Sequence, residues 1–345
     1  MNIIICATQV PFIRGGAEVH VEGLRDALLQ SGHRVDIVAL PFKWYPPSEI
    51  LSSALAWRLL DLTEANGLPV DLVICTKFPT WAVKHPNKIA WVIHQHRQAY
   101  DLYGTPLSDF TNSAEDNEVR RRIAEIDRRG LGECKALFAN SWNVARRLKE
   151  SIGLEAEPLH VPITLAGLAV EAYDDFIFSV SRLDRAKRID LLLDALALAG
   201  EPYKAVIAGE GPEAAPLRAK ARRLGIEHRV TFPGRIDTDE VVSYYNRARA
   251  VYFCPVDEDF GLVTVEAFTA GKPVLTASDA GGVLELVTDG ETGIVVEEAN
   301  PEQLAVGIRR LLDDQSLART LGVEARRRVR DIRWDRVVER LLADV

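Results

Sequence analysis

Two carboxylates with a suggestive spacing occur in the C-terminal half of this 345-residue chain. Glu258 and Glu266 lie eight positions apart, on either side of a predicted junction between a loop and a helix over residues 263–270. The backbone N–H groups around Gly261 and Leu262 then lie at a helix N-terminus, which attracts phosphate. Glu266, about one turn inside the helix, can accept two hydrogen bonds from a ribose diol. Together these features predict a nucleotide-sugar site.

A pair of cations complements these acids. Arg182 and Lys187 flank the loop 181–187, between a predicted strand and a predicted helix. Two cations aimed at one point stabilise the negative charge that grows on a diphosphate leaving group. The alternative is a solvated basic loop, and we expect Arg185 and Arg188 to be exposed.

Gly15-Gly16 and three histidines are the candidates in the N-terminal half. Gly15 and Gly16 follow the first strand and open a helix, so their backbone can approach a phosphate; a simple tight turn is the alternative. His94 and His96 end a strand, where an imidazole can hydrogen-bond a sugar or acceptor hydroxyl and relay a proton. A structural role is the alternative for both, and His20 is a weaker candidate.

The elements that must position these residues form two α/β series. The first has predicted strands at 2–8, 34–40, 71–76, 89–94 and 136–140, and helices at 17–30 and 114–129. The second has strands at 176–181, 204–208, 230–233, 250–254, 273–277 and 294–296, a short unit at 284–288, and helices at 189–198, 212–224, 239–248, 263–270 and 301–312. Strands separated by helices predict parallel sheets with right-handed crossovers. The halves join near residues 162–173, and a last helix around 334–342 either caps its own domain or crosses back.

The distinctive residues fall almost entirely in loops that follow strands. Open α/β sheets bind ligands outside the carboxyl ends of their strands, and two such sheets facing each other make a cleft. The loops in question are 9–16, 94–101, 181–187, 209–212, 234–236, 256–262 and 278–282. Their coincidence with the candidate residues favours a functional interpretation.

Composition limits the class of protein. The length suggests about two domains, and a net charge of −8 argues against nucleic acid as the main partner. The four cysteines are scattered; three lie in apolar runs, which predicts reduced thiols and a reducing, cytoplasmic compartment. Residues 1–6 read as a first strand and not a signal peptide. No apolar stretch approaches the ~20 residues that span a bilayer.

Two sequence patterns resemble sites of other kinds, a dinucleotide-binding loop and a metal-binding acid pair. Residues 209–214 match the loose dinucleotide fingerprint Gly-x-Gly-x-x-Ala, but the next strand lacks the acid that usually follows. The Asp-x-Asp pairs at 257–259 and 237–239 resemble metal-binding acids of other sugar transferases. With Arg182 and Lys187 available for the diphosphate, no metal is required.

A basic cluster lies on the predicted helix 114–129. Arg120, Arg121, Arg122, Arg128 and Arg129 surround an apolar stripe and are interleaved with acids. Contact with anionic lipid headgroups is one interpretation. A solvated helix face is the favoured one.

At this point the chain resembles the retaining glycosyltransferases of family 4, which have the two-domain GT-B architecture. The ordered features that carry the resemblance are Gly15-Gly16-Ala-Glu-Val-His20 with Gly32-His33, His94, Asn140-Ser141, Ser181-Arg-Leu with Lys187, Gly209-Glu-Gly-Pro212, Phe232-Pro-Gly234, Glu258-Asp-Phe-Gly with Glu266-Ala, Gly271-Lys-Pro-Val, Gly281-Gly282 with Glu285, and Asp289-Gly with Gly293. Each is weak alone, but the ordered set is specific.

The resemblance implies a role for each matching residue. Glu266 would hold the ribose hydroxyls, Glu258 the hydroxyls of the donor sugar, and Arg182 with Lys187 the diphosphate. The implied catalytic set is Arg182, Lys187, Glu258 and His94, with no metal. The implied donor-binding set is Gly15, Gly16, Glu266, Gly209, Gly234, Arg235, Ile236, Asp259, Phe260, Gly261 and Leu262. Asp259 stands where many members have glycine, which bears on donor choice, and either His94 or His96 can be the key histidine.

The resemblance also implies a fold, a reaction and partners. We expect an acceptor-side Rossmann-like domain at 1–168 completed by a returning helix at 328–345, and a nucleotide-sugar domain at 169–327. The expected activity is retaining transfer of a hexose from a nucleotide-diphosphate sugar to a sugar or lipid-linked acceptor, in cell-envelope or exopolysaccharide assembly. No cofactor, no metal and no nucleic acid are expected, with peripheral membrane contact left open. A nucleotide-sugar epimerase or hydrolase, or a non-catalytic binding subunit, are the alternatives.

Overall fold

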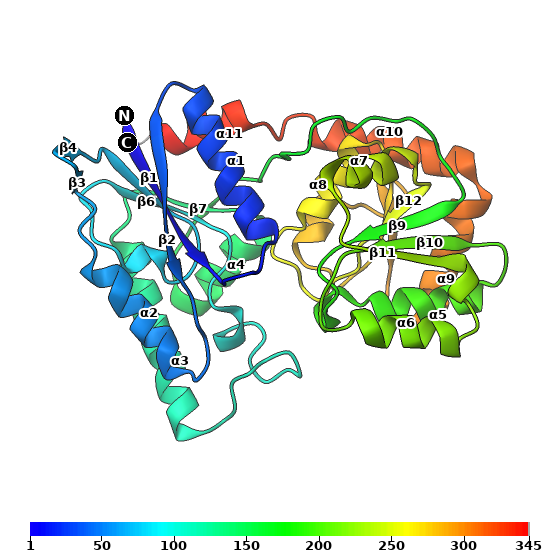
Figure 1. The fold of residues 1–345 in the computed structure, drawn as a ribbon, viewed down its shortest axis with the longest axis horizontal. Helices are drawn as coiled ribbons and strands as arrows, with labels where there is room; N and C mark the ends of the chain where they lie inside the picture. Colours follow the sequence, from blue (N-terminus) through cyan, green and yellow to red (C-terminus); the bar gives the residue numbers. More distant parts are fainter. Residues whose placement is uncertain (344–345) are drawn as a thin grey trace. The chain divides into compact units, whose positions relative to one another are not determined.

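The computed structural model describes residues 1–343, which form two compact units. Unit 1 comprises Met1–Val161 together with the chain from Ile332 onward, and unit 2 comprises Pro162–Asp331 (Figure 1). The expected boundary lay a few residues later, at 168/169. Asn246 accounts for the difference, because its side-chain amide donates to the Gly167 carbonyl at 2.9 Å and accepts from the Ala169 N–H at 2.8 Å. Those bonds attach the connecting segment to unit 2.

Unit 1 contains a six-stranded parallel sheet in the order β2-β1-β5-β6-β7-β8. The strands are β1 (Asn2–Gln9), β2 (Arg34–Pro41), β5 (Leu72–Cys75), β6 (Lys88–Val92), β7 (Leu137–Ala139) and β8 (Glu157–Pro158), with a small hairpin of β3 (Glu64–Ala65) and β4 (Leu68–Pro69). The helices are α1 (Gly16–Gln30), α2 (Ser48–Leu59), α3 (Ala114–Gly132), α4 (Trp142–Ile152) and α11 (Trp334–Leu342). All residues of β5 and β6 are buried, as is usual for parallel strands covered on both faces.

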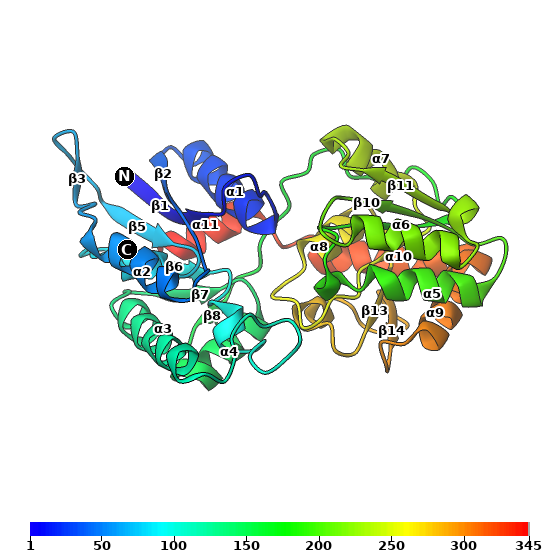
Figure 2. The same ribbon diagram turned by 60° about the horizontal axis from the view of Figure 1, so that its bottom comes forward.

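Helices cover both faces of this sheet. α1 and α11 pack together on one face, and α2, α3 and α4 form the layer on the other (Figure 2). α11 returns to unit 1 after the whole of unit 2, as the resemblance implied. It buries Val337, Val338 and Leu341, and the Trp334 ring packs edge-on against Trp91 with centroids 6.1 Å apart.

Unit 2 contains a second six-stranded parallel sheet in the order β11-β10-β9-β12-β13-β14. The strands are β9 (Phe176–Val180), β10 (Lys204–Ala208), β11 (Val230–Gly234), β12 (Ala250–Tyr252), β13 (Val274–Ala277) and β14 (Gly293–Val296). The helices are α5 (Ile189–Ala199), α6 (Ala214–Arg223), α7 (Thr238–Arg247), α8 (Leu262–Thr269), α9 (Pro301–Asp313) and α10 (Gln315–Val329). The strand order is that of a Rossmann-type doubly wound sheet, so the two expected parallel-sheet domains are confirmed.

Several elements were not predicted. They include the helices α2, α4 and α10 and the short strands β3, β4 and β8. α2 buries Ile50 and Trp57 but exposes Leu55 and Leu59, so its apolar residues occupy no single stripe. The unit expected at 284–288 is instead a 3-10 turn, η5 (Gly282–Glu285), followed by irregular chain.

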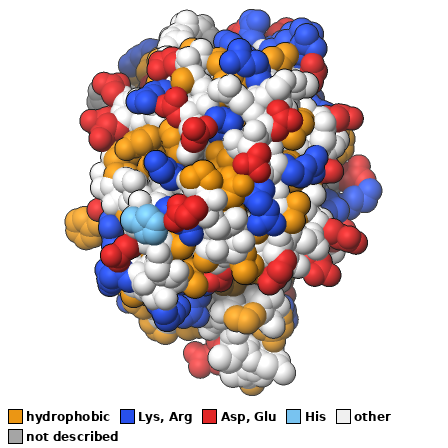
Figure 3. Space-filling model, turned by 90° about the vertical axis from the view of Figure 1, so that its right-hand side faces the viewer, with side chains coloured by type: hydrophobic (Ala, Val, Ile, Leu, Met, Phe, Trp, Pro, Cys, Tyr) orange, Lys and Arg blue, Asp and Glu red, His pale blue; other side chains and the backbone are white. Residues whose placement is uncertain are grey.

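The surface carries charges of both signs. Figure 3 shows one face of the molecule, on which basic, acidic and apolar side chains are interspersed. No helix among residues 1–343 combines the length and the apolar character that crossing a membrane requires.

Candidate active site

The loops after β9 and β12 meet at the centre of the unit 2 sheet. β9 has β10 on one side and β12 on the other, so the strand order reverses between β9 and β12. Such a switch point opens a crevice at the carboxyl ends of the strands. The Val256 N–H donates to the Ala186 carbonyl at 2.8 Å, which joins the two loops directly.

Lys187 and Glu258 form an ion pair across this junction. The Lys187 ammonium donates to Glu258 Oε2, and the two side chains are only 20% and 17% exposed. The same ammonium lies 5.4 Å from the centre of the Phe253 ring. The predicted cation and the predicted acid are therefore neighbours, although 71 residues separate them in sequence.

The other arginines of the β9 loop differ in their surroundings. Arg182 is exposed, and its side chain has no hydrogen-bond or ion-pair partner within residues 1–343. Arg185 is also exposed and lies 3.4 Å from Glu213, as expected. The expectation for Arg188 was wrong: its guanidinium makes two hydrogen bonds to the Asp279 carboxylate, at 2.8 and 2.6 Å, and is 17% exposed.

The second predicted acid lies inside α8. This helix begins at Leu262, and Gly261 caps it with φ of 85°, a conformation that favours glycine. Glu266 lies one turn inside the helix, where burial raises the pKa of its carboxyl to about 7. The Tyr245 hydroxyl donates to Glu266 Oε2 at 2.7 Å and orients the carboxylate. Sequence reasoning missed Tyr245, because nothing on α7 marks it as a neighbour of α8.

Two glycines shape the loop that carries Glu258. The Glu258 N–H donates to the Ala280 carbonyl at 3.1 Å, and the Gly282 N–H donates to the Glu258 carbonyl at 2.8 Å. A Cβ at Gly281 would lie 2.6 Å from the Glu258 carbonyl oxygen, and one at Gly282 would lie 2.2 Å from that of Asp259. Gly281-Gly282 therefore permits this close approach.

The remaining members of this loop are Asp259 and Phe260. Phe260 is 3% exposed, so its ring is buried. Any contact between Phe260 and the donor would therefore involve mainly its backbone, whereas the Asp259 side chain is partly exposed.

The loops after β10 and β11 lie beside the β9 loop. Gly209 has φ of 123°, and its N–H donates to the Gly234 carbonyl at 2.8 Å. A Cβ at Gly209 would lie 1.9 Å from the Ser181 carbonyl oxygen, and one at Gly211 would lie 2.3 Å from that of Leu183. Close packing of two loops thus accounts for the glycines that imitate a dinucleotide fingerprint.

The end of β11 and the loop after it carry Gly234, Arg235 and Ile236, which the resemblance implied as donor-binding residues. Arg235 is exposed and Ile236 partly exposed, immediately after β11. Asp237 is the N-cap of α7, since its carboxylate accepts the Glu240 N–H at 2.9 Å. The Asp-x-Asp pair at 237–239 therefore begins a helix. Among residues 1–343, no group of three or more His, Cys, Asp or Glu side chains is arranged to hold a metal ion.

Gly15 and Gly16 are exposed at the start of α1 in unit 1. The Gly15 N–H donates to the Glu18 carboxylate at 2.8 Å, which completes the first turn of the helix. A Cβ at Gly16 would meet no atom within 4 Å. Among the described residues of unit 1, nothing requires a glycine at position 16.

The three histidines of unit 1 are in different environments. His94 follows β6, and its Nδ1 donates to the Gln95 carbonyl at 2.6 Å. The His96 ring packs among the rings of Phe42, Phe78 and Phe110, each with its centroid 5.9 Å away, and burial is the main cause that lowers its pKa to about 4. This geometry favours His94 over His96 for contact with substrate.

His20 was a weak candidate and is a core residue. It lies on the buried side of α1 and is 2% exposed, and its ring packs edge-on against Trp91 with centroids 4.0 Å apart. Burial lowers its pKa to about 3.

The basic cluster on α3 is largely paired along the helix. Arg121 and Arg122 both bond the Glu118 carboxylate at 2.7 Å, and Arg129 lies 3.3 Å from Glu133. Arg120 stacks over the Tyr103 ring, 3.2 Å from its centre. These contacts favour the solvated-face interpretation.

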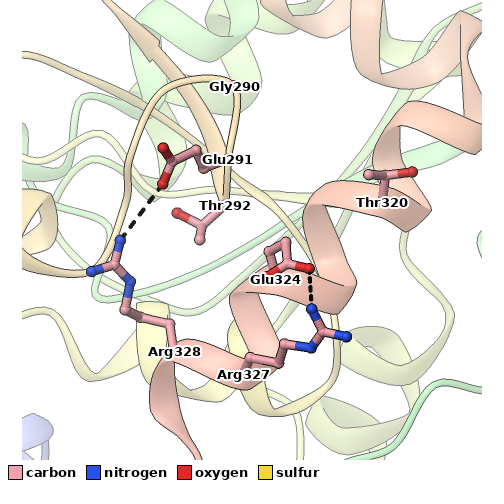
Figure 4. A pocket seen from close by; sticks show the side chains of 7 residues that line it. All are labelled: Gly290, Glu291, Thr292, Thr320, Glu324, Arg327 and Arg328. Atoms are coloured by element: carbon pink, nitrogen blue, oxygen red, sulfur yellow. Dashed lines mark hydrogen bonds and ion pairs between the residues drawn. The ribbon is translucent and has the colours of Figure 1, made fainter.

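The motif at 289–293 lies away from the strand ends that carry the candidate residues. It is the turn before β14, at the amino edge of the sheet, and it borders an open pocket of about 520 Å³ (Figure 4). Arg327 pairs with Glu324 at 2.5 Å, and Arg328 lies 4.0 Å from Glu291. Because open α/β sheets bind ligands outside the carboxyl ends of their strands, this pocket at the amino edge is a poor site for a diphosphate.

Comparison with known proteins gives the class. Residues 167–328 match the family model described as Glycosyl transferases group 1, and residues 14–161 match that described as Glycosyltransferase Family 4. A D-inositol 3-phosphate glycosyltransferase of Corynebacterium diphtheriae is 34% identical, over 99% of this chain and 88% of the relative. An uncharacterised glycosyltransferase of Methanocaldococcus jannaschii is 25% identical, over 95% of this chain and 93% of the relative.

Solved structures share the fold. Anabaena Alr3699/HepE, solved with UDP and glucose, has a TM-score of 0.73 and 19% identity, with 99% of each chain covered. Sucrose-phosphate synthase from Thermosynechococcus elongatus has a TM-score of 0.75 and 20% identity, covering 99% of this chain and all of that one. Two parallel-sheet units of this kind form the GT-B fold. The chain belongs to glycosyltransferase family 4.

Proposed function

We propose that this protein is a retaining glycosyltransferase that moves a hexose from a nucleotide-diphosphate sugar to a sugar or lipid-linked acceptor, in cell-envelope or exopolysaccharide assembly. The observation that carries the proposal is the Lys187–Glu258 pair at the switch point of unit 2. HepE, which shares the fold, was solved with UDP and with UDP-glucose, which supports a nucleotide-sugar donor.

The donor-binding roles follow from charge and hydrogen-bonding capacity. Lys187 and Arg182 would bind the diphosphate, and the N-terminus of α8 would add backbone N–H groups. Glu266 would accept hydrogen bonds from both ribose hydroxyls. Glu258, released from Lys187 when the diphosphate binds, would accept hydrogen bonds from the donor sugar. Gly209 and the segment Gly234, Arg235 and Ile236 would border the nucleotide.

The proposed chemistry needs no protein nucleophile. The acceptor oxygen attacks the anomeric carbon on the face from which the diphosphate departs, so the configuration is retained. One carbon–oxygen bond forms, the bond to the diphosphate breaks, and the acceptor's proton passes to a diphosphate oxygen. Cations aimed at that leaving group stabilise the transition state, a contribution of about 3–4 kcal/mol for one well-placed group.

The proposed acceptor is a polyhydroxylated molecule, but its identity is not specified. Several curated relatives are named for D-inositol 3-phosphate, a phosphorylated cyclic polyol. An acceptor panel should therefore include inositol phosphates beside sugars and lipid-linked sugars. His94, Gly15 and Gly16 of unit 1 are the residues whose substitution should affect transfer without abolishing nucleotide binding to unit 2.

The test has two steps. A thermal-shift panel of nucleoside diphosphates and nucleotide sugars identifies the donor, since a ligand that binds the native state raises its stability. NMR then follows the anomeric proton with and without acceptors. Retained configuration in an acceptor-dependent product supports the proposal. Conversion of the donor alone would replace it with an epimerase or hydrolase.

Substitution of the cations tests the mechanism. Arg182→Ala and Lys187→Ala should each lower turnover by about 10²-fold or more at saturating donor. Arg185→Ala, which removes an exposed cation from the same loop, is the matched control and should stay near wild type. Near-wild-type turnover in both test variants would rule out the assigned role. Activity should also survive EDTA, and a strong loss would show that a metal is needed.

A further inference from the structure

A buried carboxylate without a cationic partner lies behind the loop that carries His94. Asp127 of α3 has no exposed surface, and within residues 1–343 it forms no ion pair. Burial raises the pKa of its carboxyl to about 6. Desolvating such a group destabilises the fold unless its hydrogen bonds offset the loss. Core packing alone would be served better by an apolar side chain.

Three donors converge on this carboxylate. The Trp81 indole N–H donates to Asp127 Oδ1 at 2.9 Å. The Tyr100 hydroxyl and the Gln95 amide donate to Oδ2 at 2.7 and 3.2 Å. A carboxylate is acceptor-only and has lone pairs for all three, whereas an asparagine would turn an NH₂ group toward one set of donors.

The two oxygens of Asp127 serve different parts of the fold. Trp81 lies in the buried 3-10 turn η1 (Thr80–Ala82). Gln95 and Tyr100 flank the turn η2 (Arg97–Ala99), in the irregular chain after β6. Oδ1 therefore bonds a buried turn of the core, and Oδ2 bonds a residue on each side of the loop after β6.

Gln95 links this network to His94. Its side-chain amide donates to Asp127 Oδ2 at 3.2 Å, and its Oε1 lies 3.1 Å from the Ser151 hydroxyl, whose one proton is shared with the Arg147 carbonyl at 2.6 Å. The backbone carbonyl of Gln95 accepts from His94 Nδ1 at 2.6 Å. Because a carbonyl can only accept, the proton lies on Nδ1, and a neutral His94 then has its acceptor lone pair on Nε2.

We propose that Asp127 is a positioning residue for the reaction: through Gln95 and Tyr100 it holds the loop after β6, and thereby fixes the orientation and tautomer of His94. The inference rests on the proposed function only in requiring that His94 meets the sugar or acceptor. The placement of the loop by Asp127 does not depend on it.

Matched substitutions separate positioning from stability. Tyr100→Phe removes a bond to Oδ2, and Trp81→Phe removes the bond to Oδ1. Both should lower the melting temperature. Tyr100→Phe should lower kcat by about tenfold or more with donor KM within twofold, whereas Trp81→Phe should keep kcat within about twofold. Loss of kcat in both variants, or in neither, would overturn the inference.

Hydrogen exchange provides a readout that is independent of activity. In Asp127→Asn, or in Tyr100→Phe if that variant does not fold, amides of residues 95–103 should exchange at least tenfold faster, with β1 and β5 unchanged. Unchanged exchange in the loop overturns the inference whether or not sugar transfer is observed. Faster exchange in a chain whose wild type transfers no sugar would instead refute the proposed function and support the role of Asp127 in holding the loop.

Discussion

Glu266 combines burial with a role that requires ionisation. Its pKa is raised to about 7 by burial, and the Tyr245 hydroxyl only partly opposes this. Above the ordinary pKa near 4.5, the carboxyl loses its proton in the unfolded state but retains it in the folded state. Glu266 therefore reduces the stability of the ligand-free protein as pH rises from about 4.5 to 7.

Donor binding should show the opposite trend. Two ribose hydroxyls bond best to the ionised carboxylate, so affinity for a nucleotide sugar should rise through pH 7, by up to about tenfold per unit below it. A nucleotide sugar is the right probe, because its diphosphate has no terminal ionisation near pH 6. Calorimetry between pH 5.5 and 8.5 measures the trend. Glu266→Gln cannot titrate and should flatten the profile; an identical profile in that variant would contradict the assignment.

The candidate residues were predictable only where local sequence specifies them. Lys187, Glu258 and Glu266 stand in loops or first helical turns next to recognisable strands, where an α/β sheet binds ligands. Tyr245 and Asp127 act through contacts between helices and loops that are distant in sequence. No spacing pattern in the sequence predicts a contact between residues so far apart. Arg188 was misjudged for the same reason, since Asp279 is 91 residues away.

At the scale of elements, the loop 257–261 keeps its shape because Gly282 has no side chain. Gly282→Ala would place a Cβ 2.2 Å from the Asp259 carbonyl oxygen, so the loop would have to move. We expect a loss of about 1–3 kcal/mol in the free energy of unfolding, as for an overpacked core, together with weaker donor binding. Chemical denaturation and calorimetry measure both.

Gly132→Ala is the control for this prediction. A Cβ there meets no atom of residues 1–343 within 4 Å, and Gly132 ends α3. Its unfolding free energy should be unchanged or raised by up to about 1 kcal/mol, with donor affinity unaffected. Equal behaviour of the two variants would mean that the glycine does not shape the loop.

Most elements in which apolar periodicity and caps agree were predicted, although α4, which has Ser141 as N-cap and a left-handed Gly153 at its end, was missed. α7 begins at Asp237 with a capping box, and α9 begins after Asn300 with Pro301 at its first position. α2 lacks a side-chain cap and a single apolar stripe, and α10 follows α9 with one intervening residue. Tertiary contacts, which the sequence pattern does not reveal, define those helices.

At the scale of the whole molecule, the chain closes unit 1 with its last helix. Leu341 has no exposed surface in α11, so Leu341→Ala should lower the free energy of unfolding by about 2–5 kcal/mol. Nucleoside diphosphate affinity should stay near the wild-type value, because the side chains proposed to bind it, Arg182, Lys187 and Glu266, lie in unit 2. Hydrogen exchange should accelerate in β1 and β6 but not in β9 and β12.

Val306→Ala provides the comparison. Val306 is 49% exposed on α9, and its truncation should change stability by no more than about 0.5 kcal/mol. If Leu341→Ala cost no more than this control, α11 would not belong to the core of unit 1.

The most direct test compares a nucleoside diphosphate with the matching nucleoside, on wild type, Lys187→Ala and Glu266→Ala. Calorimetry measures the diphosphate, and NMR titration measures the weaker nucleoside. Lys187→Ala should lose tenfold or more in affinity for the diphosphate and nothing for the nucleoside, since only the first carries the charge that Lys187 meets. Glu266→Ala should weaken both ligands, because both carry the ribose diol. Equal affinity of wild type and Lys187→Ala for the diphosphate, or an equal loss for both ligands, would contradict a diphosphate-sugar site at the β9–β12 switch point.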